Sequence, residues 1–221
     1  MIGKKDNREA GFTLIEIVIA VAIVAIFAAV LSPMVFRHLE DAKVGVASTE
    51  TETIGTAILT YYKDVGKWPY TDENGPSGNG IDRLISSTKI AEGSGPEAGS
   101  AARKWGSFGT AKQLGDYLYS NNADDNTGSN AGGETDQDWP TSGAGAWRGP
   151  YIESYTMNDP WGNAYVVNCR YFPSGGYDGG VIHKVIVLSA GPNGKWETSF
   201  KDNVTEAVAG DDWTCPGFVD T

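Results

Sequence analysis

The feature that most constrains this chain is an apolar stretch near its N-terminus, from residue 12 to residue 36. Its 25 residues carry a single charge, the carboxylate of Glu16. A helix rises about 1.5 Å per residue, so this stretch reaches about 37 Å and exceeds the roughly 30 Å of a bilayer core. A carboxylate in lipid is costly, so Glu16 is expected to have a partner. The stretch predicts either an ordinary membrane anchor or a helix that passes between a membrane and a protein assembly.

The residues before this stretch predict its orientation. Residues 1–11 carry three cationic and two acidic side chains, a net charge of +1. By the positive-inside rule they stay in the cytoplasm, and everything after Phe36 lies on the other side of the membrane. A cleaved secretory signal has an apolar region of only about 7–15 residues, so this stretch is too long to be one.

The composition argues against two functional classes. The chain has 28 acidic and 17 basic side chains, a net charge of −11, and lacks the basic footprint of a nucleic-acid-binding protein. Its two histidines, His38 and His183, stand in no catalytic or zinc-ligand pattern, and there is no phosphate-binding loop. We therefore expect a protein that is not an enzyme and has no nucleic-acid partner.

The helical pattern continues beyond the apolar stretch. Apolar residues recur at spacings of three and four and form an apolar face over Ile54–Val65. One helix is expected from about Phe12 to Asp64, kinked at Pro33, where a backbone donor is missing. Lys67–Pro69 is expected to end it, because the residue before a proline disfavours the helical conformation.

Residues 70–146 give the weakest pattern. The apolar residues within 81–85 favour one short helix, and residues 112–120 favour another. Residues 121–138 are acidic and rich in Gly and Asn, which predicts a solvated loop. The alternative is a calcium loop, although the spacing of an EF-hand is absent.

From Trp147 onward the pattern turns to β structure. Residues 147–152 suggest a short strand or a strand-like arm, and Asp159–Asn163 suggests a turn. Residues 164–171 and 181–188 are rich in β-branched and aromatic side chains, and the Gly-rich loop between them predicts an antiparallel hairpin. A sheet of this kind buries one face, here on the apolar face of the long helix, and leaves the other in water.

The two cysteines, Cys169 and Cys215, could form a disulfide if the domain lies in an oxidising compartment. That bond would close a loop of about 45 residues and add a few kcal/mol of stability. The alternative is two free thiols, and sequence alone does not decide the pairing.

The N-terminus resembles that of type IV prepilins and of type II secretion prepseudopilins. The resemblance rests on the charged leader, on Gly11, Phe12, Thr13 and Glu16, and on Pro33 further along the helix. It implies that a prepilin peptidase cuts between Gly11 and Phe12. It also implies that the new N-terminus at Phe12 is then methylated.

The resemblance also implies a role for Glu16, the fifth residue of the processed chain. Its carboxylate can pair with the Phe12 ammonium of a neighbouring subunit. In a low dielectric this attraction is strong and an unpaired charge is penalised, so the pair would set the stagger of subunits and draw them out of the membrane. The alternative is that Glu16 is protonated in lipid and only marks the peptidase site.

A second resemblance covers residues 147–213. The sequences WRGPYI, DPWGNAY, GPNG and GDDW are similar to those of the major pseudopilin of type II secretion. Members of that family hold a calcium ion, and the resemblance implies four ligands: the Leu188 carbonyl, the Asn193 side chain, Asp211 and Asp212. Calcium takes six to eight oxygen ligands. Asn193 stands where the family has an aspartate, which predicts a weaker site, and the alternative is a solvated acidic turn.

The resemblance implies an α+β, pilin-like fold in which a long N-terminal helix carries a small antiparallel sheet. The C-terminus would be rich in loops and stabilised by a disulfide or by calcium. The expected divisions are a cleaved leader (1–11), a transmembrane and filament-core helix (12–36), its amphipathic continuation (37–66), a loop-rich insert (67–146), and an antiparallel β domain with a C-terminal loop (147–221).

The function that the resemblance implies is that of a structural subunit of a homopolymer. The best match is a major pseudopilin, whose periplasmic filament drives protein export. The alternatives are a type IV pilin of a surface fibre, for adhesion, motility or DNA uptake, and a minor tip subunit whose insert binds a ligand. The implied partners are the prepilin peptidase, an inner-membrane assembly platform, minor pseudopilins and the bacterial inner membrane. The chain would be anchored in that membrane with its C-terminal domain in the periplasm, before it joins a periplasmic or cell-surface filament.

Overall fold

The structure is a computed structural model of the 221-residue chain. It describes residues 12–69, 71–72, 75–76, 81–89, 91, 110–122, 139–169, 172, 184–198, 213–214 and 218–219. The chain divides into two compact units, Met1–Ala42 and Lys43–Thr221. One long helix, α1 (Leu14–Val65), has residues in both units. The five divisions expected from the sequence stay predictions.

Helix α1 has 52 residues and confirms the predicted long helix. It continues through Pro33. It ends at Gly66, whose φ is +74° and whose N–H donates to the Tyr62 carbonyl at 2.8 Å. A glycine takes this left-handed conformation without the steric cost of a Cβ atom, so Gly66 ends the helix before the predicted Lys67–Pro69 stop.

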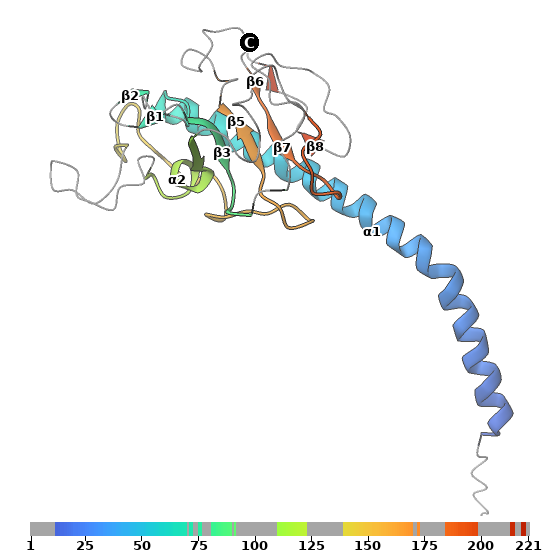
Figure 1. The fold of residues 1–221 in the computed structure, drawn as a ribbon. Coiled ribbons are helices and arrows are strands. Elements are labelled where there is room, and N and C mark those ends of the chain that lie inside the picture. Colours follow the sequence, from blue (N-terminus) through green and yellow to red (C-terminus); the bar gives the residue numbers. More distant parts are fainter. Residues whose placement is uncertain are drawn as a thin grey trace, which may run out of the picture. The chain divides into compact units, whose positions relative to one another are not determined.

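The second unit contains a five-stranded sheet in the order β4–β3–β5–β7–β8 (Figure 1). The strands are β3 (Ile81–Ile85), β4 (Thr110–Gln113), β5 (Val166–Asn168), β7 (Val187–Ser189) and β8 (Trp213–Thr214). Strands β5 and β7 pair antiparallel and confirm the predicted hairpin. Strands β3 and β4 pair in parallel. The sheet is therefore mixed, and the prediction of an antiparallel sheet is wrong for this pair.

Shorter elements complete the described part of the second unit. They are β1 (Thr71–Asp72) paired with β2 (Gly75–Pro76), helix α2 (Leu114–Leu118), and β6 (Lys184–Val185) paired with β9 (Phe218–Val219). Helix α2 falls within residues 112–120 and confirms the helix predicted there, although its first two predicted residues belong to β4.

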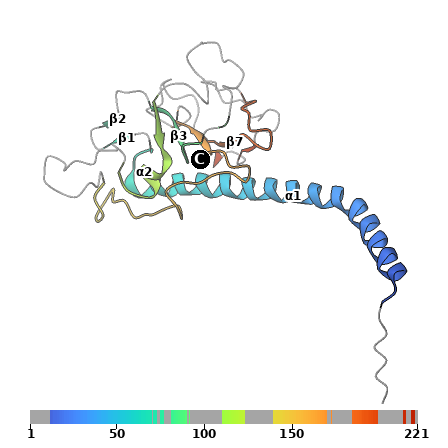
Figure 2. The same ribbon diagram turned by 60° about the horizontal axis from the view of Figure 1, so that its bottom comes forward.

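Both faces of the sheet are covered. On one face Leu84 and Val167 pack in a single cluster with Ile58 of α1. On the other face Val166 packs in a second cluster with Trp196 (Figure 2 shows the sheet beside α1). The prediction that this second face lies in water is wrong, because the chain that follows β7 folds back over it.

Tyr165 ties the sheet to α1. Its side chain is fully buried, and its hydroxyl donates a hydrogen bond to the Glu50 carboxylate of the helix. Burial raises the pKa of Tyr165, and the hydrogen bond to Glu50 acts in the same direction. Tyr165 therefore stays a neutral donor to this carboxylate, and the pair fixes one point of contact between strand and helix.

The short helix predicted over residues 81–85 is wrong, because these residues form strand β3. The apolar residues Ile81, Leu84 and Ile85 have helical spacing, which led to the prediction. In the strand, Leu84 is buried in the cluster that includes α1, and Ile85 is buried in the cluster on the opposite face. A short apolar run that is buried on both faces does not distinguish a strand from a helix by periodicity.

Residues 147–152 form no regular strand, so of the two forms predicted for them the short strand is wrong. Isolated hydrogen bonds hold this segment in place of the regular ladder of a strand. The Trp147 indole N–H donates to the Tyr117 carbonyl at 2.9 Å. The Tyr151 N–H donates to the Leu118 carbonyl at 2.7 Å. Pro150 within the segment has no N–H to donate, which disfavours a regular strand.

Candidate assembly site at the start of the long helix

Glu16 and Thr13 form a capping box at the first turn of α1. The Thr13 N–H donates to Glu16 Oε2 at 2.8 Å, and the Thr13 hydroxyl donates to the same oxygen at 2.7 Å. In return the Glu16 N–H donates to Thr13 Oγ1 at 3.4 Å. This reciprocal arrangement satisfies backbone donors that have no partner inside the helix.

The capping box places the Glu16 carboxylate at the N-terminal end of the helix. The end of a helix dipole is positive there, which favours a negative charge. A carboxylate offers about four acceptor positions, so two bonds to Oε2 leave capacity for a further donor such as an ammonium group. Phe12, the expected N-terminus after processing, is exposed in the same unit, whereas Gly11 lies outside the described residues.

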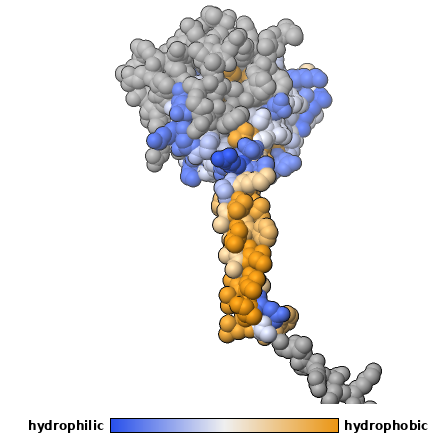
Figure 3. Space-filling model, turned by 90° about the vertical axis from the view of Figure 1, so that its right-hand side faces the viewer, coloured by the Kyte–Doolittle hydropathy of each residue, from blue (hydrophilic) through white to orange (hydrophobic). Residues whose placement is uncertain are grey.

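The apolar part of α1 presents its side chains to its surroundings. Every residue from 12 to 42 is exposed, and Figure 3 shows the helix surface as an apolar zone. Among the described residues, α1 is the one helix that is long and apolar enough to cross a membrane. Pro33 lies in this segment and lines a surface hollow together with Met34 and Arg37. A helix that is apolar all round is expected in lipid or in the core of a protein assembly.

The expected calcium ligands fall partly inside the described residues. Leu188 lies in β7 and is buried, and Asn193 lies in the exposed turn that follows. The Asn193 side-chain oxygen accepts the Lys195 N–H at 2.8 Å. Asp211 and Asp212 lie outside the described residues, and within the described part no group of three His, Cys, Asp or Glu could hold a metal ion.

Asp159 organises the turn that precedes β5. It is buried, and its Oδ1 accepts the N–H groups of Asn163 at 2.7 Å and Trp161 at 3.1 Å. Its Oδ2 accepts the Ser189 hydroxyl at 2.7 Å. Gly162, with φ +88°, closes the turn and confirms the turn predicted at Asp159–Asn163. Asp159 thus joins this turn to the end of β7.

One of the two cysteines lies in the described part of the chain. Cys169 is buried next to β5, in the cluster that packs against α1. Cys215 lies outside the described residues. The Cys169–Cys215 disulfide therefore stays a prediction.

Sequence reasoning missed the capping box of Thr13 and Glu16 and the hydrogen bonds of Asp159. The local part of each has a signal in the sequence. Thr13-Leu14-Ile15-Glu16 has the spacing of a capping box, with Ser or Thr followed three residues later by Glu. Asp159 begins a turn, where an Asp side chain bonds to backbone N–H groups ahead of it. The bond from Asp159 to Ser189 joins residues 30 positions apart, so no local pattern predicts it.

The comparisons with known proteins agree with this geometry. Residues 6–32 match the family model described as the prokaryotic N-terminal methylation motif. The chain is 30% identical over 108 residues to the type II secretion system core protein G of Pseudomonas aeruginosa, a match that covers 49% of this chain and 66% of that protein. It is 41% identical over 73 residues to the type IV major pilin protein PilE1 of Neisseria gonorrhoeae, covering 33% of each chain.

A third relative is the fimbrial protein of Neisseria meningitidis serogroup A. It is 32% identical over 91 residues, which covers 40% of this chain and 54% of that protein. The matches thus span between one third and just under two thirds of the lengths of these relatives. No solved structure matched the chain.

An apolar N-terminal helix with the methylation motif, followed by a small mixed sheet packed on its later turns, defines an α+β, pilin-like protein. The chain belongs to the type IV pilin-like superfamily and is close to its major pseudopilins.

Proposed function

We propose that this chain is the structural subunit of a pilin-like filament. The observation that carries the proposal is the exposed apolar stretch of α1, residues 12–36, which begins with the methylation motif and a capped carboxylate. Lipid covers such a helix while the subunit waits in the inner membrane. Other copies of the same helix cover it after assembly. The proposed chain has a structural task and no catalytic one.

Glu16 has a role in both the membrane-embedded subunit and the assembled filament. Cleavage after Gly11 creates an ammonium group at Phe12, and the Glu16 carboxylate of a neighbouring subunit pairs with it. Inside a filament core the dielectric is low, so a missing partner leaves a buried charge at a cost of about 3–5 kcal/mol. The capping bonds from Thr13 keep the carboxylate partnered before the neighbour arrives.

Within the superfamily we assign the chain to the major pseudopilins of type II secretion. Of the three relatives described above, core protein G shares the longest matched segment. The filament would then grow in the periplasm from an inner-membrane assembly platform, with minor pseudopilins at its tip, and drive protein export. A type IV pilin of a surface fibre is the second candidate, favoured by the similarity to the Neisseria pilins.

Shearing native cells distinguishes these candidates. The sheared fraction and the cell envelope are probed by immunoblot at natural expression. A pseudopilin stays in the envelope, and deleting its gene removes exported proteins from the medium. A pilin is released with long surface fibres, which would overturn the secretion assignment. A minor tip subunit is present in much smaller amount than the other subunits of its filament.

We also propose a calcium ion at the end of β7, held by the Leu188 carbonyl, Asn193, Asp211 and Asp212. The strand register supports it, because Trp213, the residue after Asp212, pairs with Ser189, the residue after Leu188. The four groups supply oxygen donors, which suit calcium. The ion would contribute stability and charge neutralisation at this turn. A chelator is expected to lower the melting temperature of the full chain, and an unchanged melting temperature would remove the calcium proposal.

A further inference from the structure

A surface hollow lies on the side of α1 at the point where the apolar stretch ends. Its volume is about 470 Å³, and it belongs wholly to the first unit. Its lining residues recur at the spacing i, i+3, i+4, i+7, i+8 and i+11, so they share one face of the helix. They are Val30, Pro33, Met34, Arg37, His38 and Asp41. We call this site the Pro33 hollow.

The lining of the Pro33 hollow changes in character along the helix axis. Val30, Pro33 and Met34 supply apolar groups. The Arg37 guanidinium follows about one helical turn later, and the Asp41 carboxylate about one turn after that, at a pitch of about 5.4 Å. Both charged side chains are exposed, and within the described part of the chain neither is engaged in an ion pair. The hollow therefore presents apolar groups, then a cation, then a carboxylate.

The position of Arg37 in α1 matches one surface of a bilayer. No charged side chain lies between Glu16 and Arg37, which are 21 residues apart. At about 1.5 Å per residue this separation is about 32 Å, close to the roughly 30 Å of a bilayer core. A charged side chain is costly inside the core and is stable at its boundary. A subunit in the membrane therefore places Arg37 at the outer headgroup layer.

The charges around the hollow favour a zwitterionic lipid. Residues 37–43 contain two cations, Arg37 and Lys43, and two carboxylates, Glu40 and Asp41. Because these charges cancel, the segment lacks the cluster of cations that attracts anionic lipids. Within the hollow, Arg37 lies on the membrane side and Asp41 on the water side. Their complement is a phosphate near the membrane followed by a cation nearer to water.

We propose that the Pro33 hollow holds the headgroup of one phosphatidylethanolamine molecule. The Arg37 guanidinium, whose planar set of N–H donors suits a phosphate, binds the phosphate group. The Asp41 carboxylate accepts the N–H donors of the ammonium group beyond it. Val30, Pro33 and Met34 contact the first carbons of the acyl chains. A choline group carries methyl groups in place of these N–H donors, so the site distinguishes two lipids of equal net charge.

The bound headgroup has a consequence for the anchored subunit. Arg37 cannot enter the bilayer core without leaving its phosphate, so the contact fixes the depth of α1 in the membrane. The lipid leaves when other copies cover the helix in the filament. This inference rests on the membrane-embedded state of the proposed function and names the lipid that this state binds.

Native mass spectrometry of the full chain tests the proposal. The chain is reconstituted in nanodiscs that contain equal parts of phosphatidylethanolamine, phosphatidylcholine and phosphatidylglycerol. The lipid that stays bound after release from the nanodisc is then identified and counted. We expect phosphatidylethanolamine to be retained roughly two- to fivefold over each of the other two, in line with the strength of an exposed charge pair.

Variants assign the two contacts. Arg37→Ala is expected to lower the retention of phosphatidylethanolamine about fivefold, the effect of one cation at a membrane surface. Arg37→Lys keeps the charge and should retain most of the lipid. Asp41→Asn removes the carboxylate charge, and phosphatidylcholine should then be retained as well as phosphatidylethanolamine. Glu52→Gln, at an exposed carboxylate further along α1, is the control and should change neither result.

Three outcomes would overturn the proposal. Equal retention of the three lipids by the unmodified chain would exclude a specific headgroup site. Stronger retention of phosphatidylglycerol would show a site for negative charge alone, without a role for Asp41. Unchanged lipid retention in Arg37→Ala together with a loss of filament would assign Arg37 to a contact between subunits.

These outcomes are distinct from a failure of the proposed function. A chain that forms filaments normally but shows no lipid preference loses the lipid site and keeps the filament proposal. Absence of any filament from the unmodified chain in cells that process it would contradict the proposed function itself.

Discussion

The two parts of helix α1 differ in how far their side chains are buried, although they form one continuous helix. From residue 12 to residue 42 every side chain is exposed, including bulky apolar residues such as Phe27 and Phe36. From Ala47 to Val65 eight residues are buried against the rest of the second unit. Residues 12–36 of the first part are apolar on all sides, whereas the second part is apolar on one side only. A helix of the first kind has no partner of its own in the described structure, whereas one of the second kind belongs to a folded core.

The largest effect is expected from Glu16→Gln, which tests the role of the exposed first part of α1. Glutamine keeps the size of the side chain and the capping-box geometry but removes the charge. We expect leader cleavage to continue and the amount of filament to fall by at least about tenfold, because the partner ammonium is left as a buried charge at a cost of about 3–5 kcal/mol. Shearing followed by immunoblot measures the loss. Normal polymer from this variant would refute the pairing with Phe12.

Two isoleucines of the same helix sharpen the comparison. Ile58 is fully buried, whereas Ile19 is 52% exposed. Ile58→Ala is expected to reduce the free energy of unfolding by about 2–5 kcal/mol, because it leaves a cavity in the core. Ile19→Ala is expected to leave the melting temperature of the second unit unchanged. Thermal unfolding of the full chain in detergent measures both. Equal shifts would show that the two parts of α1 are not distinct in their packing.

A smaller effect is expected at Asp159, which organises the second unit away from α1. Asp159→Ala removes the acceptor of the buried Asn163 N–H, of the half-buried Trp161 N–H and of the buried Ser189 hydroxyl. A buried group left without its acceptor costs about 1–3 kcal/mol. The variant should melt at a lower temperature than the unmodified chain. Asp41→Ala, at an exposed site on α1, is the control and should not. A melting temperature insensitive to Asp159 would mean that the turn does not depend on its carboxylate.

The smallest effect concerns the first turn of α1. Thr13→Val removes the capping hydroxyl, which is worth about 1 kcal/mol at a helix N-terminus. We expect faster amide hydrogen exchange in the first turn and no change beyond Ala47. Thr13→Ser retains the hydroxyl and should exchange like the unmodified chain. An unchanged first turn in Thr13→Val would indicate that the capping box does not hold Glu16.

Some features of the fold could be predicted from the sequence, and others could not. The length of α1 and the buried face at Ile54–Val65 could be predicted, because helical periodicity over many residues is a strong signal. The parallel pairing of β3 with β4 could not. It joins residues that are separated by a long stretch of Gly-rich sequence, and the apolar residues of β3 have the spacing of a helix.

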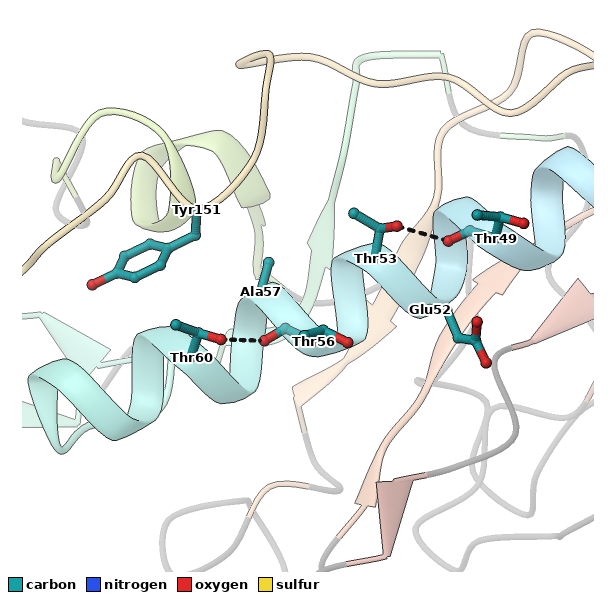
Figure 4. Close-up of a pocket in the computed structure, with 7 residues that line it drawn as sticks. All are labelled: Thr49, Glu52, Thr53, Thr56, Ala57, Thr60 and Tyr151. Atoms are coloured by element: carbon teal, nitrogen blue, oxygen red, sulfur yellow. Dashed lines mark hydrogen bonds between the residues drawn. The ribbon is translucent and has the colours of Figure 1, made fainter.

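The candidate site was predictable in its chemistry and less so in its contacts. The single carboxylate of the apolar stretch and the residues around Gly11 and Phe12 identify the assembly end of the chain. The bonds from Thr13 to Glu16 are local and could have been read from their spacing. The hollow of about 470 Å³ between Tyr151 and the Thr53 face of α1 (Figure 4) could not be predicted, because Tyr151 approaches α1 only through the tertiary fold.

Mass spectrometry of the N-terminal peptide tests the central claim most directly. The protein is isolated from the cells that produce it and digested, and the peptide that contains Phe12 is identified. A processed pilin-like subunit predicts a peptide that begins at Phe12 and carries a methyl group on its amine. An intact leader beginning at Met1 on every molecule would contradict the account, because the Glu16 carboxylate would then have no N-terminal ammonium at Phe12 with which to pair.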